Sequence, residues 1–277
     1  MRTWKLRKLS KKKKIKMKSD LPLNLRRAEQ KAAEIIDSLG ITSPEHIRLK
    51  DIAYDRGAVI VEGPLKGAAA SLVRRGQKAT IRIQKNEIHP ERKRFSIAHE
   101  LGHFVLKHKH DLQLVCTEND MLDWYHDSGQ ESEANTFAGE LLLPRKLIQD
   151  RCDVREVNFR PVRNLATDFR TSLTATAIRF VRFCPEMCAF VFSKNAKIEW
   201  FYKSNDWWPF IRKGRRLDSR TVAADFFKSN KGIKIPDEPI EIDGDAWVEN
   251  DRVETIVEHS IGSQKFGSVF SILWIRS

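Results

Sequence analysis

Residues 98–103 read Ala-His-Glu-Leu-Gly-His, and this short segment organises the interpretation of the whole chain. Residues four apart on a helix lie on one face, so His99 and His103 can present imidazole nitrogens to one metal ion from a rigid backbone. Glu100 lies beside them, where a carboxylate can take a proton from a water and return it to a leaving amine. Two solvated helix histidines are the alternative, but the apolar residues around the pair argue against it.

A catalytic metal site needs a third protein ligand and an open position for water. The extended motif with a third histidine is absent, because position 106 is Leu and position 109 is Lys. His108 is five residues past His103 and off the ligand face of the helix, so we expect His108 and His110 to be exposed cations at the helix end.

A carboxylate from a second predicted helix is the better candidate. That helix begins with the capping-box pattern Ser128-x-x-Glu131, which gives Glu131 a structural explanation. Glu133 and Glu140 are seven residues apart and share a face. We favour Glu133 as the ligand, because it lies near the helix start beside the small Ala134, which allows a close approach to the histidine helix. We keep Glu140 as the alternative.

Three polar residues near this helix are candidates for supporting roles. Asn135 can hydrogen-bond a metal ligand or cap nearby backbone. Tyr125 and His126 precede the helix and can donate a hydrogen bond to an oxyanion, although packing is the commoner role of a loop aromatic.

The segments on either side predict an α+β fold. We expect a small antiparallel sheet before the histidine helix, and helices before and after it. Beyond residue 184 the chain becomes strand-rich and holds five of the seven tryptophans, enough aromatic bulk for a separate core. The expected helices are 25–39, 47–54, 91–108, 128–143, 162–169 and 173–182, and the expected strands are 58–61, 68–73, 79–83, 188–192, 198–202, 255–261 and 267–275.

The net charge of +13 is concentrated at one end of the chain. Residues 1–19 hold ten basic side chains and no acidic one, whereas the remainder has 40 basic against 37 acidic residues. A nearly neutral body has no global electrostatic preference for nucleic acid. The tail is expected to be a disordered extension or an over-long start, and its sharper interpretation is a non-specific, salt-dependent DNA contact.

Composition also argues against membrane and secreted classes. The longest stretch without a charged residue is 266–275, half of the roughly 20 apolar residues that a membrane-spanning helix needs. Four cysteines are too sparse for a disulfide framework and predict a reducing cytoplasm. Cys184 and Cys188 are expected to be buried thiols rather than metal ligands.

Two segments resemble the ImmA/IrrE family of bacterial metallopeptidases. They are residues 94–103, Arg-Phe-Ser-Ile-Ala-His-Glu-Leu-Gly-His, and residues 133–144, Glu-Ala-Asn-Thr-Phe-Ala-Gly-Glu-Leu-Leu-Leu-Pro. The resemblance implies a zincin-like peptidase domain with Zn²⁺ on His99, His103 and Glu133, and with Glu100 as general base. The same donor set also suits Mn²⁺ or iron.

The resemblance extends to domain organisation. Residues 165–180 look like the family's helix-turn-helix-like module, and the strand-rich end is similar to the GAF-type sensor domain of longer members. We therefore expect a basic tail at 1–19, a zincin-like metallopeptidase domain at 20–150, the helical module at 151–184 and a GAF-like α+β domain at 185–277.

Family membership would imply a cytoplasmic endopeptidase that cuts a helix-turn-helix repressor and so derepresses stress-response or mobile-element genes. The alternatives are a DNA-binding regulator or a toxin–antitoxin component that uses the zincin domain as a scaffold. The candidate recognition helix offers only Arg179 and Arg182 as basic groups, fewer than a reader of DNA usually brings. Two packing helices that link the domains are the simpler interpretation.

Overall fold

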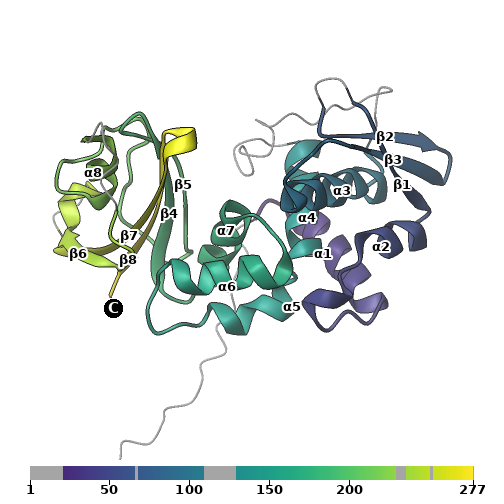
Figure 1. Ribbon diagram of the computed structural model, residues 1–277. Helices are drawn as coiled ribbons and strands as arrows, with labels where there is room; N and C mark the ends of the chain where they lie inside the picture. The colour runs from purple at the N-terminus through teal and green to yellow at the C-terminus, as the bar shows by residue number, and fades with distance from the viewer. Residues whose placement is uncertain (1–20, 66–67, 109–128, 229–234, 250–251, 277) are drawn as a thin grey trace, which may run out of the picture.

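The computed structural model describes residues 21–65, 68–108, 129–228, 235–249 and 252–276, so the basic tail lies outside the described residues. The described chain is a mixed α+β structure with two sheets (Figure 1). Its helices are α1 Leu23–Ser38, α2 Leu49–Asp55, α3 Pro90–Val105, α4 Gln130–Leu142, α5 Arg145–Ile148, α6 Phe159–Phe169, α7 Leu173–Phe183 and α8 Val222–Lys228. Its strands are β1 Ala58–Gly63, β2 Ala70–Arg75, β3 Lys78–Gln84, β4 Met187–Lys194, β5 Lys197–Lys203, β6 Ile240–Asp243, β7 Thr255–Ser263 and β8 Ser268–Ile275.

The first sheet is mixed, so the expectation of an antiparallel sheet is wrong for one of its two strand pairs. Its order is β1-β3-β2, with β3 parallel to β1 and antiparallel to β2. A tight hairpin at Gly76, whose φ of +62° suits glycine, reverses β2 into β3. Strand β3 lies between β1 and β2 and runs in the same direction as β1. The pair that it forms with β1 is therefore parallel.

Helix α3 packs against β2 and β3 on one side and against α4 on another. The approach to α4 is close at Gly102, where a Cβ atom would lie 3.0 Å from a Phe137 ring carbon and 3.2 Å from the Ala134 Cα. The expectation that small Ala134 allows this approach is confirmed. Two small residues therefore bring the backbones of α3 and α4 together directly beside the histidines.

The second sheet has the order β5-β4-β8-β7-β6, and each neighbouring pair is antiparallel. Successive strand residues point to opposite faces. Phe190 and Trp274 belong to the same buried apolar cluster as α6 and α7, whereas Val191 joins a second cluster with Trp247. A separate aromatic core therefore exists on one face of this sheet, and the other face shares the core of the helical part of the chain.

Helix α7 carries a buried pair of arginines that join three helices. Arg179, only 1% exposed, donates to the Glu140 carboxylate of α4, to Glu29 of α1 at 3.0 Å and to the Leu143 carbonyl at 2.9 Å. Arg182 donates to the other Glu29 oxygen at 2.8 Å. The two basic groups that a DNA-reading helix would need are therefore used inside the protein.

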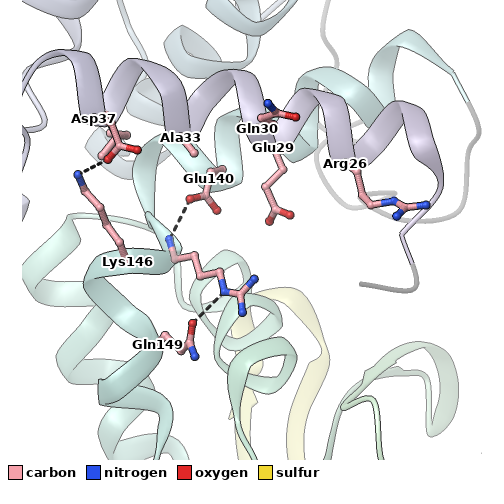
Figure 2. Close-up of a pocket in the computed structure, with 10 residues that line it drawn as sticks. Arg26, Glu29, Gln30, Ala33, Asp37, Glu140, Lys146 and Gln149 are labelled. Atoms are coloured by element: carbon pink, nitrogen blue, oxygen red, sulfur yellow. Dashed lines mark hydrogen bonds and ion pairs between the residues drawn. The ribbon is translucent and has the colours of Figure 1, made fainter. Parts of the chain in front are cut away.

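The cluster borders a cleft of about 460 Å³ between α1 and the α4–α5 segment (Figure 2). Glu29 and Glu140 line it, and Lys146 bridges it to Asp37 of α1 at 2.6 Å. Glu140 also accepts a hydrogen bond from the Arg145 backbone at 3.0 Å. Opposite charges on the cleft walls thus fasten α1 to the start of α5.

Glu258 on β7 is the corresponding buried charge of the second sheet. It has no exposed surface and accepts hydrogen bonds from four donors. These donors are the backbone amides of Val222 and Ala223, the Trp247 indole and the Ser260 hydroxyl, at 3.0, 2.7, 2.8 and 2.6 Å. The carboxylate therefore fixes the start of α8 and the largest side chain of the second cluster to one strand.

Replacing Arg179 by Met should destabilise the protein by about 3–5 kcal/mol, because the buried Glu140 loses its charged partner and the partly buried Glu29 keeps only Arg182. Burial raises the pKa of Glu140 even with Arg179 beside it. Removing the arginine raises that pKa further, so the loss should grow as pH rises through the pKa that Glu140 has in the folded wild type, and it should shrink below that pKa. Urea unfolding at several pH values measures this.

Two variants serve as controls for this prediction. Arg151→Met breaks an exposed ion pair with Asp168 and should cost about 0–1 kcal/mol. Adding Glu140→Gln to the Arg179 variant should recover part of the loss. A loss no larger than that of Arg151→Met would contradict the structural role of the cluster.

Replacing Glu258 by Gln should cost about 1–3 kcal/mol, because the new amide group turns a donor toward other donors. The readout is urea unfolding followed by tryptophan fluorescence. Glu241→Gln is the matched control, since Glu241 makes only an exposed pair with Arg276 at 2.9 Å. Equal stability of the two variants would show that the four hydrogen bonds do not hold the second core.

Candidate metal centre

The two histidines of α3 are buried and turned toward each other. His99 is 3% exposed and His103 is fully buried, and their Nε2 atoms lie 2.9 Å apart. Helix periodicity produces this pairing, since the residues are four apart. The interpretation of solvated surface histidines therefore does not apply.

Glu131 of α4 approaches both imidazoles. Its carboxylate oxygens lie 3.2 Å from the His99 Nε2 atom and 3.4 Å from the His103 Nε2 atom. One ligand atom from each of the three residues falls within 4.8 Å of the others. The Glu131 side chain is 36% exposed, so the group is open to solvent on the carboxylate side.

The structure does not bring Glu133 or Glu140 to these Nε2 atoms. Glu133 instead lies 3.2 Å from the His108 Nε2 atom and accepts a hydrogen bond from Asn24 at 3.1 Å, while Glu140 pairs with Arg179. The assignment of Glu133 as a ligand stays a prediction, and the contacts favour Glu131.

The expected capping role hid Glu131 from sequence reasoning. Helix α4 begins at Gln130, with Gly129 in the N-cap position and no side-chain capping bond, and Ser128 lies outside the described residues. A signal was present in the spacing, since Glu131 and Asn135 are four apart and share a helix face.

Asn135 holds the first histidine from behind. Its Oδ1 atom lies 2.8 Å from the His99 Nδ1 atom. An amide oxygen can only accept, so His99 carries its proton on Nδ1 and leaves the Nε2 lone pair for a metal ion. The supporting role considered for Asn135 therefore has its hydrogen bond in the structure.

His108 is buried, which corrects the expectation of an exposed cation. Helix α3 ends at Val105, and Lys107 adopts a φ of +58°. This left-handed residue turns the chain back, so His108 is 7% exposed and its Nδ1 atom lies 2.9 Å from the Nδ1 atom of His103. The remaining candidates in this region, His110, Tyr125 and His126, lie outside the described residues.

The three central groups share charge in a way that suits a bound cation. Burial lowers the pKa of His103 to about 4. Burial acts in the same direction on His99, but Glu131 and Glu100 together raise its pKa above the ordinary value. Burial alone would raise the pKa of Glu131, and hydrogen bonds from His103 and His99 hold it well below its usual range. The site therefore keeps an ionised carboxylate facing the imidazoles.

Glu100 is fully buried on the same helical turn and lies close enough to influence the pKa of His99. Two imidazoles and a carboxylate with an exposed side are a donor set that zinc and other divalent ions accept. The residues present therefore fit a divalent metal, with Glu100 next to the ligands.

Other candidate features carry no metal chemistry in the part of the chain that is described. Cys152, Cys184 and Cys188 are buried free thiols, as expected for the last two. None of the described helices is long and apolar enough to cross a membrane.

The chain was compared with known proteins. The family model named Peptidase M78, IrrE N-terminal-like domain, matches residues 53–181. A solved structure titled Mycobacterium tuberculosis transcriptional regulator is similar, with a TM-score of 0.53 and 14% identity, covering 90% of this chain and 76% of that chain. At that identity the similarity concerns the fold alone. No curated protein matches.

The matched range contains α3, α4 and the three residues that gather at the candidate centre. Residues 53–181 are therefore similar to the IrrE N-terminal-like domain, which supports the resemblance to the ImmA/IrrE family.

Proposed function

We propose that the protein is a zinc-dependent endopeptidase whose metal is held by His99, His103 and Glu131, with Glu100 as general base. The observation that carries the proposal is the convergence of two buried Nε2 atoms and one carboxylate within 4.8 Å. Glu133, the ligand implied by the family motif, is the competing third ligand. Manganese or iron in place of zinc would use the same donors.

The metal ion, when bound, polarises the substrate carbonyl and lowers the pKa of water. Glu100 accepts the proton of the attacking water and passes it to the leaving amine. Asn135 keeps the His99 ring in the orientation that presents Nε2. The exposed side of Glu131 leaves room for a peptide beside the ligands.

The proposed substrate class rests on the resemblance to the ImmA/IrrE family. We propose that the protein cuts a helix-turn-helix repressor in the cytoplasm and thereby derepresses stress-response or mobile-element genes. The zincin-like domain would perform the cut, the second sheet would act as a GAF-like sensor, and the basic tail would make non-specific DNA contacts.

Among the described residues, the contacts of α7 argue against its use as a DNA reader. Arg179 and Arg182 are 1% and 8% exposed, and both pair with acidic groups of other helices. We therefore propose that α6 and α7 link the two parts of the molecule by packing.

Zinc should raise the unfolding temperature of the metal-free protein by several degrees, because a ligand at 100 times its Kd adds about 2.7 kcal/mol to the folded state. His99→Ala and Glu131→Gln should lose this shift. Glu34→Gln, on the exposed face of α1, is the control that should keep it. A full zinc shift in the His99 variant would show that the metal binds elsewhere.

Glu100→Gln should keep the zinc shift and slow cleavage by at least about 100-fold, because the carboxylate handles the proton rather than the metal. The assay incubates the purified protein with a helix-turn-helix repressor encoded by a neighbouring gene and follows the fragments by mass spectrometry. Cleavage at the wild-type rate would rule out Glu100 as the general base.

A further inference from the structure

A line of four polar side chains runs from α1 to the second histidine of the centre. Asn24 donates to the Glu133 Oε1 atom at 3.1 Å, and the Glu133 Oε2 atom lies 3.2 Å from the His108 Nε2 atom. The His108 Nδ1 atom in turn lies 2.9 Å from the His103 Nδ1 atom. The line therefore joins α1, α4 and the turn after α3 to one ring.

The hydrogen bonds of the line determine which ring nitrogen of each histidine carries a proton. If the His103 Nε2 lone pair faces the metal, its Nδ1 atom carries the proton and must donate. The His108 Nδ1 atom then accepts, which places the proton of His108 on Nε2. Glu133 is the acceptor for that proton, and its second oxygen accepts from the Asn24 amide. Each contact of the line then joins one donor to one acceptor.

The backbone is shaped to hold this arrangement. Lys107 takes a left-handed backbone conformation that residues other than glycine rarely adopt. The His108 amide donates a hydrogen bond to the His103 carbonyl at 3.1 Å. The result places the His108 ring, 7% exposed, against the fully buried His103. A helix continued through residue 108 would point that ring about 140° away.

We infer that His108 and Glu133 are positioning residues, and that Glu133 acts on the centre through His108 rather than as a metal ligand. The inference rests on the proposed metal site. It assigns the two histidine ligands different supports. His99 is held by the neutral amide of Asn135, whereas His103 is held by an imidazole backed by a carboxylate.

Zinc affinity, measured by competition with a chromogenic chelator, tests the inference. Glu133→Gln and His108→Leu should each weaken zinc binding about 10- to 100-fold, the usual effect of losing an outer partner of a ligand. The double variant should bind zinc no more weakly than the weaker single variant, because both changes interrupt one line. Glu131→Gln should weaken binding much more.

Rescue and spectroscopy separate positioning from a merely structural effect. His108→Gln keeps an oxygen that can accept from the His103 Nδ1 atom, so it should bind zinc more tightly than His108→Leu. In the cobalt-substituted protein, the visible spectrum of Glu133→Gln should stay close to that of the wild type, while Glu131→Gln should change both position and intensity. Urea unfolding of each metal-free variant shows whether it is folded. Asn24→Leu is the substitute if the other variants do not fold, because it removes only the hydrogen bond to Glu133.

Several results would overturn the inference. One is loss of zinc binding in Glu133→Gln together with near wild-type affinity in Glu131→Gln, which would make Glu133 the ligand. Another is a double variant whose loss of zinc affinity equals the product of the losses in the His108 and Glu133 single variants. Wild-type protein that binds no zinc would instead overturn the proposed function itself, and the inference with it, so the two failures are distinguishable.

Discussion

The close contact between α3 and α4 at Gly102 and Ala134 is the constraint on which the candidate centre depends. A single additional carbon at Gly102 would meet both Phe137 and the α4 backbone within 3.2 Å. This close approach lets side chains of α3 reach those of α4. The contact sets His99 against both Glu131 and Asn135, and it does so from two helices whose inner faces are buried.

Helix α1 extends this constraint to the rest of the molecule. Its apolar stripe packs along α4, and its polar residues reach in two directions. Asn24 contacts Glu133 near the centre, whereas Glu29 contacts both buried arginines of α7. One rigid helix thus connects the metal-binding part of the chain to the helical segment that carries the second sheet. Arg179 also contacts Glu140, so α7 is tied to α4 as well as to α1.

The parts of this architecture that the sequence predicts are those that depend on residues close together in the chain. The histidine helix, its buried face and the small residue at the helix crossing all follow from residues three or four apart. The seven expected strands also lie within a few residues of strands in the structure, because alternation and turn signals are local, but the short strand β6 was not expected. The parallel pairing of β1 with β3 was not predictable in this way, since it depends on which strands become neighbours in the sheet.

The centre itself shows where local rules fail. Glu131 fitted a capping box so well that its tertiary contacts with two imidazoles were passed over. His108 was placed by continuing a regular helix, whereas one left-handed residue at Lys107 turns it inward. The sequence presents Arg179 only as a basic group of a possible recognition helix, whereas the structure surrounds it with two carboxylates from distant helices. In all three cases, a partner far away in the sequence decided the outcome.

The pairing of β4 with β8 also bears on the order in which the protein is assembled. The central strands of the second sheet come from residues 187–194 and 268–275, so the sheet's middle cannot close until the later strand has been synthesised. Until then, the apolar cluster that Trp274 completes stays open to water. The nascent chain therefore exposes apolar surface while the intervening segment is synthesised. Such surface is what chaperones bind during folding.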